Sequence, residues 1–188
     1  MDYTERFEIL FRNLIRDEGG YLPQKEAIKI KDEGGATKYG ISLNFLRSRG
    51  VKEFDFNYDG IIDEKDIMIL NLPQAKEIYY RYFYSPLYEK LFDIRLANLL
   101  FNFGVNAGKH RAVKLLQICI NKILKLRLLK IDGIFGTNTL AAANNIDKDI
   151  LFNEYSKAIE MFYKSLNKPQ FISGWLNRLK RAINFYLL

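Results

Sequence analysis

The sequence contains one cysteine, one histidine and four prolines among its 188 residues. A single cysteine excludes an intramolecular disulfide, so cysteine usage does not indicate a redox compartment. Cys119 lies in the apolar run LLQICINKIL, which is typical of a small core residue rather than a nucleophile. His110 has no second His or Cys near it in the sequence. A zinc site and a Cys-His dyad are therefore both poorly supported.

Long apolar runs are also missing. A membrane-spanning helix needs about 20 consecutive apolar residues, and no segment approaches that length. The first 20 residues, MDYTERFEILFRNLIRDEGG, lack the positive start, the uninterrupted apolar stretch and the small-residue cleavage site of a secretory signal. We expect synthesis in the cytoplasm without a signal peptide, and no stable membrane insertion.

The composition is that of a soluble globular protein, with 48% hydrophobic and 27% charged residues. The net charge of +7 favours anionic partners such as nucleic acid, acidic lipid or bacterial wall polymers, unless it serves solubility alone. Lys and Arg are spread along the chain without a basic stripe that carries base-stacking aromatics. We therefore expect no binding to nucleic acid. We also expect the protein to be a monomer.

Helical periodicity dominates the chain. The first helix is expected to begin at Thr4 and to end before Gly19 and Gly20. Its apolar stripe is Phe7, Leu10, Phe11, Leu14 and Ile15. Later helices are expected within 43–50, 73–85, 96–108, 110–129, 137–145, 150–167 and 174–188, and short strands around 27–32 and 37–41. This pattern predicts a mainly α fold with a minor β hairpin.

Glu18 continues the apolar stripe of the first helix. A carboxylate at the edge of an apolar face is partly desolvated, which raises its pKa. A raised pKa suits a general acid that works near neutral pH. The alternative is a helix-terminal Glu held by hydrogen bonds to the glycine amides that follow it.

The segment KDEGGAT supplies polar groups that a glycosidase would need opposite its acid. Gly34 and Gly35 can fold this loop back toward Glu18. Asp32 would then act as a base or as an electrostatic stabiliser, and the Thr37 hydroxyl would position a water molecule. Taken alone, DEGG is also an ordinary turn sequence.

EGGY followed by DEGGATKYGIS resembles the N-terminal signature of the glycoside hydrolase 108 family of bacterial and phage N-acetylmuramidases. AKEIYYRYFY, LFNFGVNAG, KLLQ, IDGIFGTNTL and GWLNRL match further family blocks in the same order, so the resemblance covers most of the chain. It implies a lysozyme-like helical fold, cleavage of β-1,4 bonds in peptidoglycan glycan strands, and Glu18 at the catalytic acid position. The linking segment LPQKEAIKIKDEGG is longer and more basic than the family's, which leaves open whether Asp32 or Glu33 is the second group.

The resemblance also implies a division of roles along the chain. Residues 1–95 are expected to form the catalytic muramidase lobe, and residues 96–188 a helical peptidoglycan-binding-like lobe packed on it. In the turn DGIFG of this second lobe, Ile134 and Phe135 are expected to enter the core.

Four further residues are assigned to substrate binding. Tyr21 and Tyr39 belong to the same polar loop, and aromatic faces suit pyranose rings. Asn102 and Asn106 are four residues apart on one helix. Their amides either satisfy one another or line a polar cleft that binds N-acetyl groups.

The segment DFNYDGIIDEKD has the spacing of a calcium loop. Its candidates for positions 1, 3, 5, 6, 9 and 12 are Asp55, Asn57, Asp59, Gly60, Asp63 and Asp66. A structural calcium ion remote from the chemistry is one expectation. The alternative is a metal-free acidic turn in which Asp63 caps the next helix. No cofactor is expected for catalysis.

Two functions follow from these patterns. The first is a lysozyme-type muramidase that acts on peptidoglycan in the periplasm or cell wall, as a prophage endolysin or as a secretion activator that loosens the wall. The second is a non-catalytic peptidoglycan-binding or secretion-assisting module of the same fold. Retention of Glu18 together with Asp32 and Thr37 favours the first.

Overall fold

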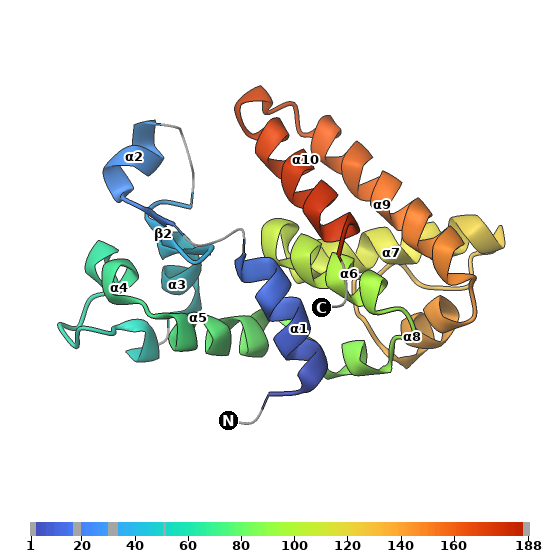
Figure 1. The fold of residues 1–188 in the computed structure, drawn as a ribbon, viewed down its shortest axis with the longest axis horizontal. Coiled ribbons are helices and arrows are strands. Elements are labelled where there is room, and N and C mark those ends of the chain that lie inside the picture. The colour runs from blue at the N-terminus through green and yellow to red at the C-terminus, as the bar shows by residue number, and fades with distance from the viewer. Residues whose placement is uncertain (1–2, 17–19, 30–33, 51, 186–188) are drawn as a thin grey trace. The chain divides into compact units, whose positions relative to one another are not determined.

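The computed structural model describes residues 3–16, 20–29, 34–50 and 52–185 (Figure 1). It divides into two compact units, one of residues Leu14–Arg81 and one that joins Met1–Asn13 to Tyr82–Leu188. These bounds differ from the expected lobes 1–95 and 96–188, because the start of the chain and residues 82–95 pack with the C-terminal helices. The roles assigned to the two lobes remain a prediction.

The unit Leu14–Arg81 contains a three-stranded antiparallel sheet in the order β1 (Tyr21–Leu22), β2 (Thr37–Lys38) and β3 (Ile41–Ser42). Tyr21 lies opposite Lys38 and Leu22 opposite Thr37, and Thr37 lies opposite Ser42 on the other side. The expected strand around 37–41 is therefore present, as part of a small sheet.

The other expected strand, at 27–32, is wrong where the structure describes it. Residues Gln24–Lys29 form the short helix α2. Pro23 starts it, since its carbonyl accepts hydrogen bonds from the amides of Glu26 and Ala27. Ala27 is fully buried, so the helix uses its one small apolar residue for packing.

Three helices complete this unit: α3 (Leu43–Arg49), α4 (Glu64–Ile69) and α5 (Leu72–Ile78), with a 3₁₀ turn at Lys52–Phe54. Ser42 caps α3 as predicted, because its hydroxyl accepts from the amide of Phe45. Asp63 and Asn71 begin α4 and α5 in capping boxes, in which the third helical residue bonds back to the cap.

The second unit is built of helices α1 (Glu5–Ile15, whose last two residues belong to the first unit), α6 (Ile94–Ala107), α7 (Lys109–Leu124), α8 (Thr137–Asn144), α9 (Lys148–Ser165) and α10 (Pro169–Ile183), with a 3₁₀ turn at Pro86–Lys90. Helix α6 is its centre and packs against α7, α9 and α10 (Figure 1). Its buried residues run without a break from Leu96 to Gly104. A helix that is apolar on all sides must be surrounded by others, as this one is.

Helix α1 carries the predicted apolar stripe into this core. Phe7 and Leu10 are fully buried, and the Phe7 ring contacts those of Tyr84 and Phe101. Thr4 accepts a hydrogen bond from the amide of Phe7, which confirms its capping role.

The predicted fold class, mainly α with minor β structure, is confirmed. In the part of the chain that the structure describes, no helix is both long enough and apolar enough to cross a membrane.

Candidate active site

Glu18, Asp32 and Glu33 lie outside the described residues. The structure describes the frame on either side of them. Strand β1 begins at Tyr21, three residues after Glu18, and β2 begins at Thr37, five residues after Asp32. These two strands are hydrogen-bonded neighbours, with Leu22 opposite Thr37. The two segments that carry the predicted catalytic groups therefore lead into adjacent strands of one sheet.

The loop before β2 is held from two sides. The amide of Ala36 donates to Oε1 of Gln24, at 2.8 Å, which ties the loop to α2. On the other side the amide of Asn44 donates to the carbonyl of Gly34, at 3.1 Å, which ties it to α3. Gly35 has φ +74°, and a Cβ built on it would lie 2.7 Å from Gln24 Oε1. Glycine is required there by both its backbone angle and this close approach.

The Thr37 hydroxyl is half-buried and donates a 3.0 Å hydrogen bond to the carbonyl of Gly35. The hydroxyl proton is therefore used in this hydrogen bond, while the hydroxyl oxygen can still accept one. A water molecule at this residue would have to donate to Thr37 rather than accept from it.

Tyr21 is tied to α4 by its hydroxyl, which donates to Glu64 Oε1 at 2.7 Å. The same oxygen accepts from the amide of Gln24 at 2.8 Å. The Gln24 amide and the Tyr21 hydroxyl lower the pKa of Glu64. Desolvation and Glu64 raise the pKa of Tyr21 to about 12. Tyr21 remains 37% exposed. Contact of its ring with a sugar stays a prediction.

Tyr39 lies in the turn between β2 and β3 with φ +51°. Its carbonyl accepts a 2.7 Å hydrogen bond from the hydroxyl of Tyr79, which is fully buried. The ammonium group of Lys38 lies 5.5 Å from the centre of the Tyr39 ring and donates to the carbonyl of Met68. This turn is therefore fixed to α4 and to the start of the π-helical turn Tyr79–Phe83.

The two predicted asparagines belong to the other unit. Asn102 is 7% exposed, and its amide nitrogen donates to the carbonyl and the side-chain oxygen of Asn98. Asn98 also accepts from Asn13 and donates to the carbonyl of Ala182. The amide nitrogen of Asn102 thus serves a buried network, whereas Asn106 is half-exposed. A role in binding N-acetyl groups remains a prediction for both.

In the acidic loop, Asp66 is fully buried. Its two carboxylate oxygens accept from the amides of Phe56, Asn57 and Asp63. Asp63 caps α4, as the metal-free alternative predicted.

The other acidic side chains bond within the same loop. Asp55 accepts from the amides of Asp59 and Gly60, and Asn57 accepts from the amide of Asp59. The amide of Ile61 and the Asn57 and Lys65 side chains lower the pKa of Asp59. Among the described residues, no group of three or more His, Cys, Asp and Glu side chains is placed to hold a metal ion. Calcium binding remains a prediction.

Three residues that were not predicted to belong to the site connect its segments: Gln24, Glu64 and Tyr79. Each makes its contact across 12 to 40 residues of sequence. No local pattern marks such contacts, because they depend on which segments meet in the fold.

The turn DGIFG of the second unit is organised by Gln117. Its amide nitrogen donates to Asp132, to the carbonyl of Ile134 and to Thr139, and its oxygen accepts from the amide of Gly133. Phe135 enters the core, but Ile134 is 66% exposed, so its expected burial is wrong. The turn places these neighbouring side chains on opposite sides.

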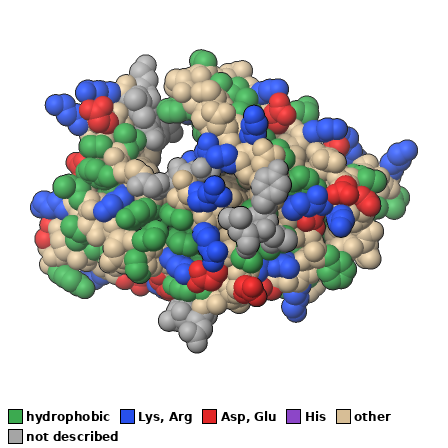
Figure 2. Space-filling view, viewed as in Figure 1, with side chains coloured by type: hydrophobic (Ala, Val, Ile, Leu, Met, Phe, Trp, Pro, Cys, Tyr) green, Lys and Arg blue, Asp and Glu red, His purple; other side chains and the backbone are tan. Residues whose placement is uncertain are grey.

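The surface bears the positive charge in many separate places. On the face shown in Figure 2, Lys and Arg side chains are interspersed with Asp and Glu. This distribution matches the scatter along the sequence.

The family profile described as Glycosyl hydrolase 108 matches residues 11–108, which is more than half of the chain. A second profile, Predicted Peptidoglycan domain, matches residues 111–180. The structure of Brucella abortus SagA superposes with a TM-score of 0.75 and 26% sequence identity, over 95% of this chain and 91% of SagA. No curated protein matches the sequence. The match over residues 11–108, which includes the sheet and its two glycine-containing segments, shows that the chain belongs to the glycosyl hydrolase 108 family.

Proposed function

We propose that this protein is an N-acetylmuramidase that cleaves the β-1,4 glycosidic bonds of peptidoglycan, with Glu18 as the general acid. Family membership makes the chain a glycoside hydrolase, and the peptidoglycan-domain match makes peptidoglycan its substrate class. The bond that is cut and the residues that cut it are the proposal. A non-catalytic wall-binding module is the competing function.

The observation that carries the proposal is the pairing of β1 with β2. Covalent geometry alone keeps the Cα of Glu18 within about 11 Å of the Cα of Tyr21, because three peptide units separate them. The neighbouring strand begins at Thr37, the first residue beyond the pinned loop. The sheet thus supports a site to which both segments contribute.

In the proposed reaction, Glu18 gives its proton to the glycosidic oxygen as the bond from that oxygen to the sugar C1 breaks. A water molecule adds to C1 and loses a proton, which leaves a new reducing end. Asp32 takes that proton or stabilises the positive charge that develops on the sugar ring. The Thr37 hydroxyl oxygen accepts a hydrogen bond from this water, because the hydroxyl proton is already donated to the carbonyl of Gly35.

The decisive test is Glu18→Gln, assayed by clearing of purified cell walls. The change is nearly isosteric but removes the transferable proton, so lysis should slow by about two to four orders of magnitude. Wall binding and thermal melting should stay as in the wild type. Glu5→Gln is the matched control, since it changes an exposed Glu at the start of α1. Near-normal lysis by Glu18→Gln would remove Glu18 from the mechanism.

Product analysis decides the bond. Mass spectrometry of the digest should show N-acetylmuramic acid at the new reducing ends. N-acetylglucosamine there would mean a different glycosidase.

The second group is tested by comparing Asp32→Asn with Glu33→Gln. If Asp32 has the role, its variant should lose most of the activity and the Glu33 variant should not. The reverse ranking would transfer the role to Glu33. Thr37→Val should have an intermediate effect, because it removes only the acceptor for the water.

A further inference from the structure

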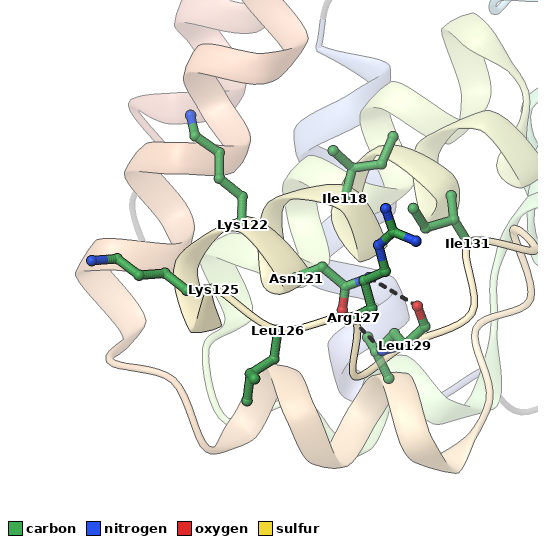
Figure 3. A pocket seen from close by; sticks show the side chains of 8 residues that line it. All are labelled: Ile118, Asn121, Lys122, Lys125, Leu126, Arg127, Leu129 and Ile131. Carbon is green, nitrogen blue, oxygen red and sulfur yellow. Dashed lines mark hydrogen bonds between the residues drawn. The ribbon is translucent and has the colours of Figure 1, made fainter.

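The second unit contains a pocket at the end of α7 and the loop that follows it. It is an open surface pocket of about 560 Å³. Figure 3 shows the side chains that line it. Its apolar lining includes Ile118, Leu126 and Ile131, which are 45%, 62% and 46% exposed. Aliphatic side chains exposed together, rather than singly, usually mark a binding surface.

The same pocket carries three cations: Lys122, Lys125 and Arg127. In Figure 3 the Lys122 and Lys125 side chains extend outward from the end of the helix, and Arg127 extends on the side of Ile118 and Ile131. Lys122 pairs with Glu154 at 2.5 Å. Within the described residues neither Lys125 nor Arg127 has an ion-pair partner, so both charges are available to an anionic ligand.

The Asn121 side chain ties the end of the loop that forms the pocket wall back to α7. Asn121 donates to the carbonyl of Leu129 at 2.8 Å and accepts from its amide at 2.9 Å. Lys125 ends α7 with φ +53°. These contacts fix Lys125 and Leu129 at the two ends of the loop, which lowers the entropic cost of ordering it when a ligand binds.

The chemistry of the lining excludes a typical sugar site. None of the described residues that line the pocket is aromatic, whereas pyranose rings are usually bound on aromatic faces. The amide side chain in the lining, Asn121, has both its nitrogen and its oxygen hydrogen-bonded to the backbone of Leu129. What remains is an aliphatic wall with cations around it, which matches a short peptide that carries carboxylates between small apolar side chains.

We propose that this pocket binds the acidic stem peptide of peptidoglycan, in which alanine residues flank two carboxylate-bearing residues. The inference rests on the proposed function, because a wall hydrolase meets this peptide beside every glycan strand it cuts. The pocket lies within residues 111–180, the part matched by the Predicted Peptidoglycan domain. Lys125 and Arg127 bind the carboxylates, and the aliphatic wall contacts the alanine methyl groups.

An anionic lipid surface offers similar charge. We favour a peptide because the pocket lies within the part of the chain that the Predicted Peptidoglycan domain matches. The experiment below distinguishes binding of the peptide from binding of lipid.

The experiment is calorimetric titration of the full chain with the synthetic tetrapeptide L-Ala–γ-D-Glu–meso-diaminopimelate–D-Ala. We expect binding that weakens with added salt. Lys125→Glu/Arg127→Glu should weaken it at least about tenfold, since both charge pairs become repulsive. Lys90→Glu/Lys148→Glu, which makes the same charge change at two exposed residues outside the pocket, should leave the Kd unchanged. Arg127→Ala, with a smaller loss of affinity, guards against misfolding of the double variant.

Three outcomes would overturn the proposal. They are absence of peptide binding by the wild type, equal weakening in the control variant, and retention of the wild-type Kd in a folded Lys125→Glu/Arg127→Glu variant. Binding to phosphatidylglycerol vesicles that the pocket variant loses, without peptide binding, would assign the surface to lipid. Glu18→Gln separates the two proposals, since it should bind the tetrapeptide normally while failing to clear walls. Peptide binding without wall lysis by the wild type would leave this inference standing and remove the proposed function.

Discussion

The hydroxyl of Tyr21 donates a 2.7 Å hydrogen bond to the carboxylate of Glu64, which lies 43 residues further along the chain. Because Glu64 Oε1 also accepts from the amide of Gln24, one carboxylate oxygen joins β1, α2 and α4. The bond to Glu64 holds Tyr21, the first residue after the EGG segment, in place. It does not involve any of the predicted catalytic residues.

Glu64→Gln should lower the free energy of unfolding at pH 7 by about 1 kcal/mol or less, because the Tyr21 ring is more than a third exposed and water competes for the contact. The pKa of Glu64 is lower in the folded protein, so its contribution is present above the unfolded pKa near 4.5 and is lost as the pH falls through the folded pKa. Urea unfolding from pH 7 to pH 3 should show the two proteins converging in acid. A constant difference across that range would mean that the carboxylate charge plays no part.

The same pair predicts a loss of stability in base. The pKa of Tyr21 is raised from 10.0 to about 12, so its contribution is complete below pH 10 and disappears as the pH rises through 12. The unfolding free energy of Tyr21→Phe should therefore fall less than that of the wild type between pH 10 and pH 12. An identical alkaline profile in the variant would contradict the assignment.

Gly35→Ala should destabilise the protein by about 1–3 kcal/mol, because φ is +74° and the new Cβ would meet Gln24 Oε1. That oxygen cannot move away without losing its bond to the amide of Ala36. Gly20→Ala is the control, since no atom of the described residues lies within 4 Å of a Cβ there. Its unfolding free energy should stay within about 0.5 kcal/mol of the wild type. Chemical denaturation of both variants measures the difference, and equal effects would remove the steric explanation.

Tyr88→Phe should stabilise the protein by about 1–2 kcal/mol. Among the described residues, the Tyr88 hydroxyl is the buried side-chain group that lacks a hydrogen-bond partner. Burying this hydroxyl away from water costs free energy that no hydrogen bond offsets, so removing it should stabilise the folded state. Tyr155→Phe is the matched comparison, because that hydroxyl donates to the carbonyl of Ala112 and its removal should cost about 1 kcal/mol. Thermal and urea unfolding report both changes. A destabilised Tyr88→Phe would show that the hydroxyl is hydrogen-bonded in solution.

Calcium binding is tested by thermal melting with calcium and then with a chelator. If the acidic loop binds the ion, calcium should raise the wild-type midpoint, and magnesium should do so much less. Asp55→Ala should melt lower even without metal, because Asp55 holds the amides of Asp59 and Gly60. The decisive readout is therefore the calcium-dependent shift, which the variant should lose. An unchanged wild-type midpoint would end the calcium hypothesis.

The sequence by itself determined where most helices lie and how several of them begin. The stripe of Phe7, Leu10 and Phe11 is buried as its spacing predicted, and Ser42 and Asp63 cap helices at the expected positions. These features depend on neighbours within one or two turns, where periodicity and capping act directly.

The tertiary structure decided what holds the site. Residues 27–29, expected in a strand, became part of a helix because Pro23 begins it and Glu64 accepts from the amide of Gln24. Asn102 bonds to Asn98, whose own partners lie far along the chain, and Ile134 faces outward because Gln117 fixes its turn. Hydrogen bonds between distant segments carry no local signature, since each residue's partner is set only when the segments meet.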